Sequence, residues 1–191
     1  MNTVAFVLAV IIGLLIAETR ISWRHERALR AKGAIEPPGD VLWALAALYP
    51  SSFVIMGIEG LYRAAALQST PAAATEAGPS WFASGMVLFV ASKALKYAAI
   101  RALGERWSFR VLIVPGLPLV ATGPYRYVRH PNYIAVVGEL VGTAMMVGAR
   151  VTGPVILVLF GIVLWARVRF EDRALGFVAP AETRVSPSDG P

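Results

Sequence analysis

A turn rich in cationic and aromatic side chains interrupts the apolar second half of the chain. Residues 123–133 read Gly-Pro-Tyr-Arg-Tyr-Val-Arg-His-Pro-Asn-Tyr and lie between two apolar stretches. Pro131 keeps His130 out of the helical region and suits the first turn of a following helix. The unsatisfied N–H groups at the start of a helix favour a negatively charged group. The turn therefore predicts a site for a ligand carboxylate at a membrane edge. The alternative is a basic loop whose tyrosines anchor it at the interface.

A second group of ionisable side chains closes the last apolar stretch. It reads Arg-Val-Arg-Phe-Glu-Asp, from Arg167 to Asp172. Arg167 and Glu171 are four residues apart and would share one face of a helix. Together with the turn at 123–133, this group predicts a pocket of mixed charge where helices meet water. The alternative for this pair is an ordinary salt bridge on the surface.

Glu139 is a carboxylate in the middle of an apolar stretch, residues 134–147. Acidic side chains inside a membrane are rare and usually face a cavity or a partner. At helical spacing, Asn132, Ala135 and Glu139 share one face. Glu139 could therefore act as a general base in a pocket. The alternative is a structural hydrogen bond to a neighbouring helix.

Other ionisable residues in the apolar stretches have simpler expectations. Glu59 allows the same two interpretations as Glu139. Glu18 lies near the end of the first apolar stretch, so we expect it at the membrane interface. Lys93 and Lys96 share a face of the third stretch, and lysines near a helix end usually extend their ammonium groups to water.

The composition is that of a membrane protein. Apolar residues make up 57% of the 191 residues, charged residues make up 16%, and the mean hydropathy is +0.61. An ordinary soluble domain carries about 25% charged residues. The net charge of +6 comes from basic residues that cluster beside apolar runs. Such residues set membrane topology, so we expect no nucleic-acid partner. The chain has no cysteine, and its two histidines are His25 and His130. Disulfides and thiolate sites are excluded, and we expect no metal site.

Five apolar stretches predict five transmembrane helices in a single all-α domain. They cover residues 3–19, 41–62, 81–103, 133–149 and 152–166. A helix needs about 20 residues to cross the hydrocarbon core, within a range of about 17–25. The first stretch is near the lower limit, and the fifth is long enough only if residues 167–170 continue its helix. We expect the domain to cover residues 1–175. Residues 176–191 are rich in Pro, Ser, Ala and charge and predict a disordered tail.

The basic residues alternate between the two ends of these helices. They follow the first, third and fifth stretches, whereas the segments at 63–80 and 148–154 carry few charges. Cytoplasmic loops hold the excess of Lys and Arg. We therefore expect the N-terminus outside, and the C-terminus and both polar groups on the cytoplasmic side. Residues 21–32 mix apolar and basic side chains and predict a separate interfacial helix. Gly33 would form its C-cap, and the Pro-Pro pair that follows would stop it.

Three motifs in the second half of the chain together resemble the isoprenylcysteine carboxyl methyltransferase family. They are Leu103-Gly104-x-x-Trp107, Gly123-x-Tyr125-x-x-x-Arg129-His130-Pro131-x-Tyr133 and Arg167-x-x-x-Glu171-Asp172-x-x-Leu175. The resemblance covers about residues 95–175, nearly half the chain, and its middle motif is more specific than its last. The stretch 24–36 is similar to the bacterial branch, some of whose members O-methylate lipidic phenols or pyrones.

The resemblance implies an integral membrane enzyme, of the bacterial cytoplasmic membrane, that uses S-adenosylmethionine to methylate a lipophilic acceptor. The acceptor would enter from the membrane lipid and be a prenylcysteine-like carboxylate or a lipidic phenol or pyrone. Arg167 would orient a carboxylate acceptor, and Glu139 or His130 would take the proton of a phenol. The residues that the resemblance assigns to a cofactor pocket on the cytoplasmic side are Gly123, Tyr125, Arg129, His130, Tyr133, Glu171 and Asp172.

The chain also departs from the family pattern. Many members have Glu-Glu where this chain has Glu171-Asp172, and they continue into a Tyr-rich helix where this chain has a polar tail after Phe177. Two other interpretations also stay open. One is an NADPH-dependent membrane reductase of the sterol type, a class with a similar C-terminal architecture but longer chains. The other is a non-enzymatic membrane protein, such as a transporter component.

Overall fold

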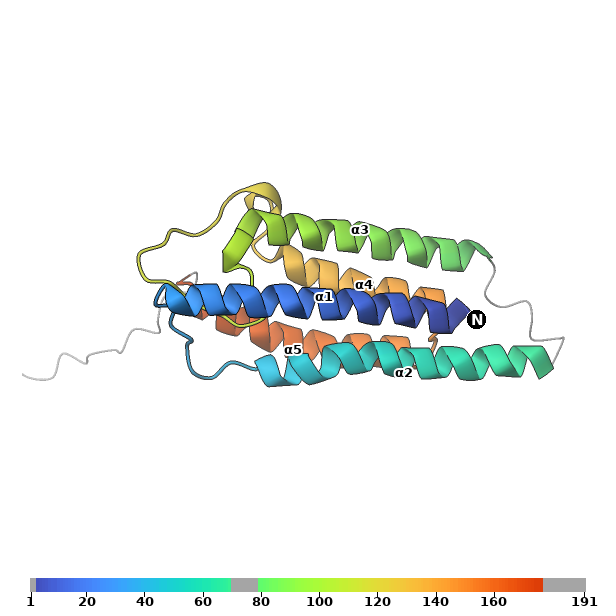
Figure 1. Ribbon diagram of the computed structural model, residues 1–191. Helices are drawn as coiled ribbons and strands as arrows, with labels where there is room; N and C mark the ends of the chain where they lie inside the picture. Colours follow the sequence, from blue (N-terminus) through green and yellow to red (C-terminus); the bar gives the residue numbers. More distant parts are fainter. Residues whose placement is uncertain (1–2, 70–78, 177–191) are drawn as a thin grey trace, which may run out of the picture.

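The described part of the chain forms a bundle of five long helices that run alternately up and down (Figure 1). A computed structural model describes residues 3–69 and 79–176. The elements are α1 (Thr3–Ala31), α2 (Leu42–Ser69), α3 (Pro79–Leu103), the short 3₁₀ turns η2 (Gly104–Arg106) and η3 (Gly123–Arg126), α4 (Pro131–Val147) and α5 (Thr152–Ala174). The described residues contain no β-strand, and an isolated bridge joins Ile35 to Ile113. The predicted all-α fold is confirmed, and residues 177–191 of the predicted tail lie outside the described residues.

Within residues 3–69 and 79–176, three helices are long and apolar enough to cross a membrane: α1, α2 as far as Ala66, and α5. α5 continues through residues 167–170 to Ala174, as a fifth span requires. α4 is apolar but has 17 residues, the lower limit for a span. α3 has 25 residues and carries Lys93 and Lys96. The five predicted helices are therefore confirmed as helices, and their five membrane crossings stay a prediction.

α1 is one continuous helix, so the prediction of a separate interfacial helix at residues 21–32 is wrong. That segment contains no Gly or Pro to break the helix, and Ser22 and Leu29 are buried against the bundle. The predicted C-cap is confirmed. Gly33 has φ of +79°, and the amide of Ala34 donates to the carbonyl of Leu29 at 3.0 Å. This six-to-one hydrogen bond is the Schellman motif that commonly ends a helix.

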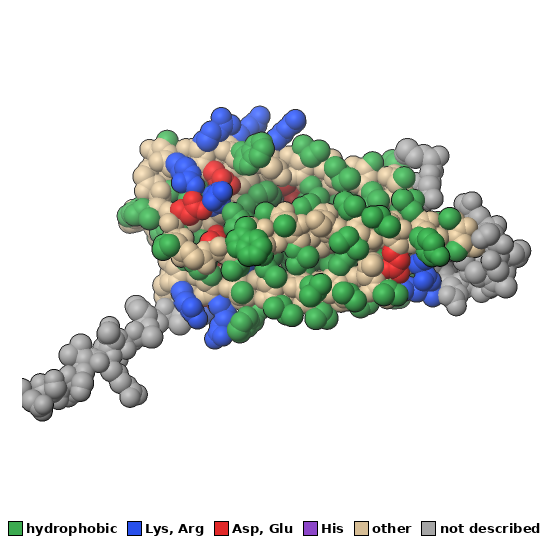
Figure 2. Space-filling view, turned by 90° about the horizontal axis from the view of Figure 1, so that it is seen from below, with side chains coloured by type: hydrophobic (Ala, Val, Ile, Leu, Met, Phe, Trp, Pro, Cys, Tyr) green, Lys and Arg blue, Asp and Glu red, His purple; other side chains and the backbone are tan. Residues whose placement is uncertain are grey.

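The connections that carry the sequence motifs lie at one end of the bundle, which we call the loop end. It comprises residues 32–41, between α1 and α2, and residues 104–130, between α3 and α4. α5 also ends there, whereas the N-terminus and the start of α3 lie at the opposite end (Figure 1). Most Lys and Arg side chains visible in Figure 2 gather at the loop end. The basic segments that alternate along the sequence thus meet on one side of the fold.

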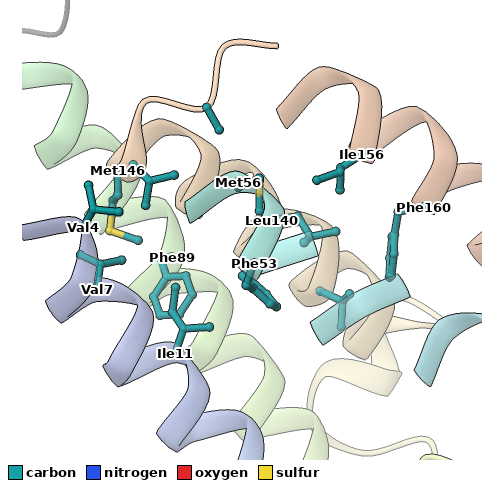
Figure 3. Close-up of a cluster of buried hydrophobic side chains, with 13 residues drawn as sticks. Val4, Val7, Ile11, Phe53, Met56, Phe89, Leu140, Met146, Ile156 and Phe160 are labelled. Atoms are coloured by element: carbon teal, nitrogen blue, oxygen red, sulfur yellow. The ribbon is translucent and has the colours of Figure 1, made fainter. Parts of the chain in front are cut away.

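Apolar side chains from all five helices form the core (Figure 3). Its members include Ile11 of α1, Phe53 of α2, Phe89 of α3, Leu140 of α4 and Phe160 of α5, each at most 6% exposed. Lipid tails are as apolar as these side chains, so burial from water does not hold membrane helices together. Close packing does.

α3 and α4 approach each other closely because glycines face each other across their contact. A Cβ atom on Gly142 would lie 2.8 Å from the carbonyl oxygen of Gly85 and 2.9 Å from the amide nitrogen of Phe89. Small residues allow such backbone contact between membrane helices. The contact fixes α4, whose first turn carries Tyr133, against α3.

Gly142→Ala is expected to lower the free energy of unfolding by about 1–3 kcal/mol, because the new methyl group forces two backbones apart. The matched control is Gly161→Ala in α5, where a Cβ atom would meet nothing within 4 Å. Circular dichroism of the detergent-solubilised protein during an SDS titration measures both. Equal unfolding midpoints for the two variants would contradict the close packing of α3 on α4.

Glu59 of α2 caps the start of α5. Its carboxylate accepts hydrogen bonds from the backbone amides of Arg150 at 2.9 Å, Val151 at 3.1 Å and Thr152 at 2.8 Å. A carboxylate at a helix N-terminus satisfies unpaired amides and complements the helix dipole. These contacts therefore support a structural role for Glu59, as a hydrogen-bond partner of a neighbouring helix, over a role as a general base.

Candidate functional site

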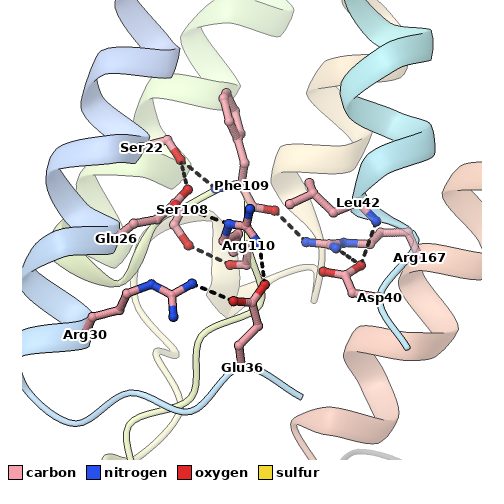
Figure 4. Close-up of polar contacts among 10 residues, drawn as sticks. All are labelled: Ser22, Glu26, Arg30, Glu36, Asp40, Leu42, Ser108, Phe109, Arg110 and Arg167. Carbon is pink, nitrogen blue, oxygen red and sulfur yellow. Dashed lines mark hydrogen bonds and ion pairs between the residues drawn. The ribbon is translucent and has the colours of Figure 1, made fainter. Parts of the chain in front are cut away.

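The buried guanidinium of Arg167 joins several segments at the loop end. Arg167 is 3% exposed. Its Nη2 donates to the carbonyl oxygen of Phe109 at 2.6 Å, and its Nη1 donates to Oδ1 of Asp40 (Figure 4). Its Nε donates to the hydroxyl of Tyr133 at 3.2 Å. These partners belong to the loop before α4, the first turn of α4 and the segment before α2. The surface salt bridge considered for Arg167 and Glu171 is therefore wrong, because Arg167 turns inward to acceptors on other segments.

Tyr133 continues this network to the end of α5. Its hydroxyl donates to Oε2 of Glu171 at 2.5 Å. Its ring stacks on His130, with the ring centroids 5.4 Å apart, and Nε2 of His130 lies 2.8 Å from Oδ1 of Asp172. The structure thus connects site residues that the sequence motifs placed far apart. We call the connected group the Arg167 cluster, which comprises Asp40, Phe109, His130, Tyr133, Arg167, Glu171 and Asp172.

The remaining residues predicted for the cofactor, Gly123, Tyr125 and Arg129, lie on the loop that leads into α4. Gly123 has φ of +57°, and a Cβ atom there would lie 3.1 Å from the Cβ of Ala102, so the turn requires glycine. Burial, and then the charge of Glu171, raise the pKa of the Tyr125 phenol. Arg129 is exposed. Within the described residues, no side-chain hydrogen bond joins Tyr125 to the Arg167 cluster, and Gly123 has no side chain to form one.

An open groove of about 500 Å³ runs between α4 and α5 beside the Arg167 cluster. Its lining is Val128, Arg129, His130, Tyr133, Ile134, Val137, Leu164 and Val168. Ile134 is 53% exposed, so the groove opens to the side of the bundle. The lining is apolar except at the end that carries Arg129 and His130. A second hollow, of about 470 Å³, has Trp81 and Pro154 in its lining and lies at the opposite end of the bundle.

Two buried acceptor atoms, one in the Arg167 cluster and one in the first turn of α4, are candidates for ligand contact. Oδ2 of Asp40 and Oδ1 of Asn132 are buried and have no hydrogen-bond partner among the described residues. Proteins rarely leave buried polar atoms unpaired, so a ligand that carries N–H groups would suit these positions. Asp40 is absent from the sequence prediction. The available signal was its place before an apolar run, where its Oδ1 accepts the amide of Leu42 at 3.0 Å as a helix cap does.

A second polar group lies inside the bundle, between α1, α2, α3 and α4. Nζ of Lys93 lies 2.5 Å from Glu18 and 3.0 Å from Glu139. Nζ of Lys96 lies 3.0 Å from each of the same two carboxylates, and the hydroxyl of Tyr49 donates to Glu139. Both carboxylates are fully buried, and the two lysines are at most 7% exposed. We call these five residues the buried ion cluster.

The expectations for Glu18 and for the two lysines are wrong. Glu18 would lie at the interface only if the first helix ended near residue 19, but α1 continues to Ala31 and places Glu18 within the bundle. Lys93 and Lys96 do not extend to water, because two ammonium groups and two carboxylates neutralise one another there. Glu139 contacts side chains of α2 and α3, as expected if its role is a structural bond to neighbouring helices. Within the described residues, no hydrogen bond or ion pair joins it to the Arg167 cluster, and its role as a base stays a prediction.

Comparison with known proteins agrees with the motifs. Residues 85–176 match the isoprenylcysteine carboxyl methyltransferase family, which confirms the resemblance. The chain is 33% identical over 96 residues to an uncharacterized protein of Bacillus subtilis, YpbQ, covering 50% of this chain and 57% of that protein. It is 27% identical over 161 residues to an uncharacterized protein of Haemophilus influenzae, covering 84% of this chain and 87% of that protein. No solved structure matches the chain.

Proposed function

We propose that this chain, whose residues 85–176 match the isoprenylcysteine carboxyl methyltransferase family, is an integral membrane methyltransferase. It would use S-adenosylmethionine to methylate a lipophilic acceptor, either a prenylcysteine-like carboxylate or a lipidic phenol or pyrone. One observation carries the proposal. Residues from two separate family motifs, among them Tyr133 and Arg167, meet in one hydrogen-bonded cluster beside an open apolar groove.

The residues at the site fit S-adenosylmethionine, which carries a carboxylate, an ammonium group and a sulfonium. Arg129 and the amide of Asn132, the first N–H group of α4, would hold the carboxylate, and the rings of Tyr125 and Tyr133 would face the sulfonium. The acidic side chains of the Arg167 cluster would hold the ammonium group. Oδ2 of Asp40 and Oδ1 of Asn132 are buried and have no hydrogen-bond partner among the described residues. They support this fit, because a bound ligand would supply their donors. When bound, this ligand supplies the methyl group for an in-line displacement.

The groove between α4 and α5 suits an acceptor that stays partly in lipid. Its apolar walls and open side would take the tail, and its polar end at Arg129 and His130 would take the reacting group. The protein then contributes mainly orientation and exclusion of water. A carboxylate acceptor is already ionised, and Arg167 would orient it. A phenol must lose its proton, and Glu139 or His130 would accept it.

The active site is expected to face the cytoplasm, because the loop end holds the basic segments. A reporter enzyme fused to the C-terminus should therefore show cytoplasmic activity in a bacterial host. The N-terminus, at the opposite end of the bundle, should report the outer side. A C-terminal reporter that is active only outside would reverse the topology and place the site on the wrong side of the membrane for a cytoplasmic methyl donor.

His130→Ala and Arg129→Ala are each expected to weaken binding of S-adenosylhomocysteine roughly tenfold to hundredfold, the effect of losing one charge-assisted contact. Calorimetry on the detergent-solubilised protein measures this. Arg126→Ala is the matched control, because it removes an exposed arginine of the same loop. Unchanged binding in both variants would remove this loop from the site. Wild-type protein that binds NADPH in place of S-adenosylhomocysteine would favour a reductase, and one that binds neither would favour a non-enzymatic membrane protein.

A further inference from the structure

One carboxylate oxygen of Asp40 has no donor among the residues that the structure describes. The side chain of Asp40 is 10% exposed. Its Oδ1 accepts the Leu42 amide at 3.0 Å and the Arg167 guanidinium, whereas its Oδ2 is buried and has no hydrogen-bond partner among the described residues. In Figure 4 the second oxygen points away from the Leu42 amide. A buried carboxylate oxygen without a donor raises the free energy of the folded protein, and a hydrogen bond from a ligand would offset this desolvation penalty.

The other two carboxylates of the Arg167 cluster already have partners and are more exposed. Oε2 of Glu171 accepts the Tyr133 hydroxyl at 2.5 Å, and Oδ1 of Asp172 lies 2.8 Å from Nε2 of His130. Their side chains are 24% and 18% exposed. Burial strengthens a charge-assisted hydrogen bond, because less water competes for it. Among the described residues, Oδ2 of Asp40 is therefore the buried carboxylate oxygen of the cluster that has no donor.

The balance of charge in the cluster favours a cationic ligand group. Within the cluster, Asp40, Glu171 and Asp172 are carboxylates, and Arg167 supplies the buried guanidinium. The acidic excess would be reduced by an ammonium group and increased by an anion. A neutral donor, such as the amino group of an adenine ring, would also form a charge-assisted hydrogen bond to a carboxylate, but it would leave the acidic excess unchanged.

We propose that Asp40 binds the ammonium group of the methyl donor through Oδ2 and, through Oδ1, positions Arg167. The inference rests on the proposed function and assigns part of its donor site to a residue outside the family motifs. It also links the donor to the fold. The same carboxylate caps α2 at Leu42 and contacts the guanidinium of Arg167, so donor binding and the geometry of Arg167 depend on one side chain.

The test compares two ligands on three proteins by calorimetry in detergent. The ligands are S-adenosylhomocysteine and an analogue in which hydrogen replaces its α-amino group. The proteins are the wild type, Asp40→Asn, and Glu105→Gln, which removes an exposed carboxylate at the same end of the bundle. The wild type and Glu105→Gln should bind the analogue roughly tenfold to hundredfold more weakly than S-adenosylhomocysteine. Asp40→Asn should bind both ligands with similar, already weakened affinity, because the two changes remove the same contact.

Asp40→Ser is the second variant, because serine can still cap α2 but has no carboxylate. If Asp40→Asn does not fold, the binding of the two ligands is compared in Asp40→Ser. A folded Asp40 variant that discriminates between the two ligands as strongly as the wild type would overturn the inference and leave the proposed function intact. Loss of discrimination in Glu171→Gln alone would also overturn it and move the ammonium group to α5. Wild-type protein that binds neither ligand would overturn the methyltransferase proposal as well.

Discussion

Replacing Lys96 with methionine is expected to lower the free energy of unfolding by about 3–5 kcal/mol, the cost of breaking a buried ion pair. Lys96 is 2% exposed, and its Nζ lies 3.0 Å from the carboxylates of both Glu18 and Glu139. Without it, two buried carboxylates face one ammonium group, and the low dielectric of the interior makes the uncompensated charge costly. An SDS titration of the detergent-solubilised protein, followed by circular dichroism, measures the loss.

Two further variants test whether this loss comes from the charge. Lys32→Met removes an exposed lysine that pairs with the exposed Glu105, and it should cost less than about 1 kcal/mol. Adding Glu139→Gln to Lys96→Met restores a neutral cluster, so the double variant should lose less than the sum of the two single variants. Additive losses, or a loss in Lys96→Met as small as that in Lys32→Met, would contradict a charge-balanced cluster.

Arg167→Ala is expected to reduce the rate of methyl transfer about 100-fold, because a displacement of about 1 Å at the reacting centre has an effect of this size. Arg167 contacts Asp40, Phe109 and Tyr133, so its loss frees the start of α2, the loop and the first turn of α4 together. Single-turnover rates at saturating S-adenosylmethionine, with a lipid extract as the source of acceptor, measure the effect. Arg173→Ala is the matched control, because it removes an exposed arginine near the end of the same helix. Equal rates in the two variants would remove Arg167 from the site.

The same assay with Glu139→Gln separates the two acceptor chemistries. If the acceptor is a phenol that uses Glu139 as its base, the substitution should lower turnover by about 100-fold or more, with cofactor affinity near that of the wild type. If the acceptor is a carboxylate, no base is needed and Arg167→Ala should be the more harmful change. The stability of Glu139→Gln is measured alongside, because the substitution also alters the buried ion cluster. Full activity in both variants would leave Glu139 and Arg167 with structural roles alone.

Local signals in the sequence predicted the elements that carry the site. Pro131 marked the first turn of the helix after His130, and α4 begins at Pro131. Gly33 marked the end of α1. These predictions succeeded because a proline that lacks an N–H group and a glycine with positive φ act within one turn of the backbone. The prediction of a separate interfacial helix at residues 21–32 failed because that segment has no such backbone signal at its start. Mixed polarity does not by itself break a helix.

The sequence by itself determined the apolar helices, the family motifs and the kinds of side chain available at the site. Only the tertiary structure decided which of these side chains meet. Asp40 and Arg167 are 127 residues apart, and Glu18 and Lys93 are 75 residues apart. Periodicity shows which face of a helix a residue occupies, but not which helix that face packs against or at what depth. A carboxylate that looks interfacial in its own stretch, such as Glu18, is therefore paired and buried once the length of α1 and the packing of α3 bring two ammonium groups to it.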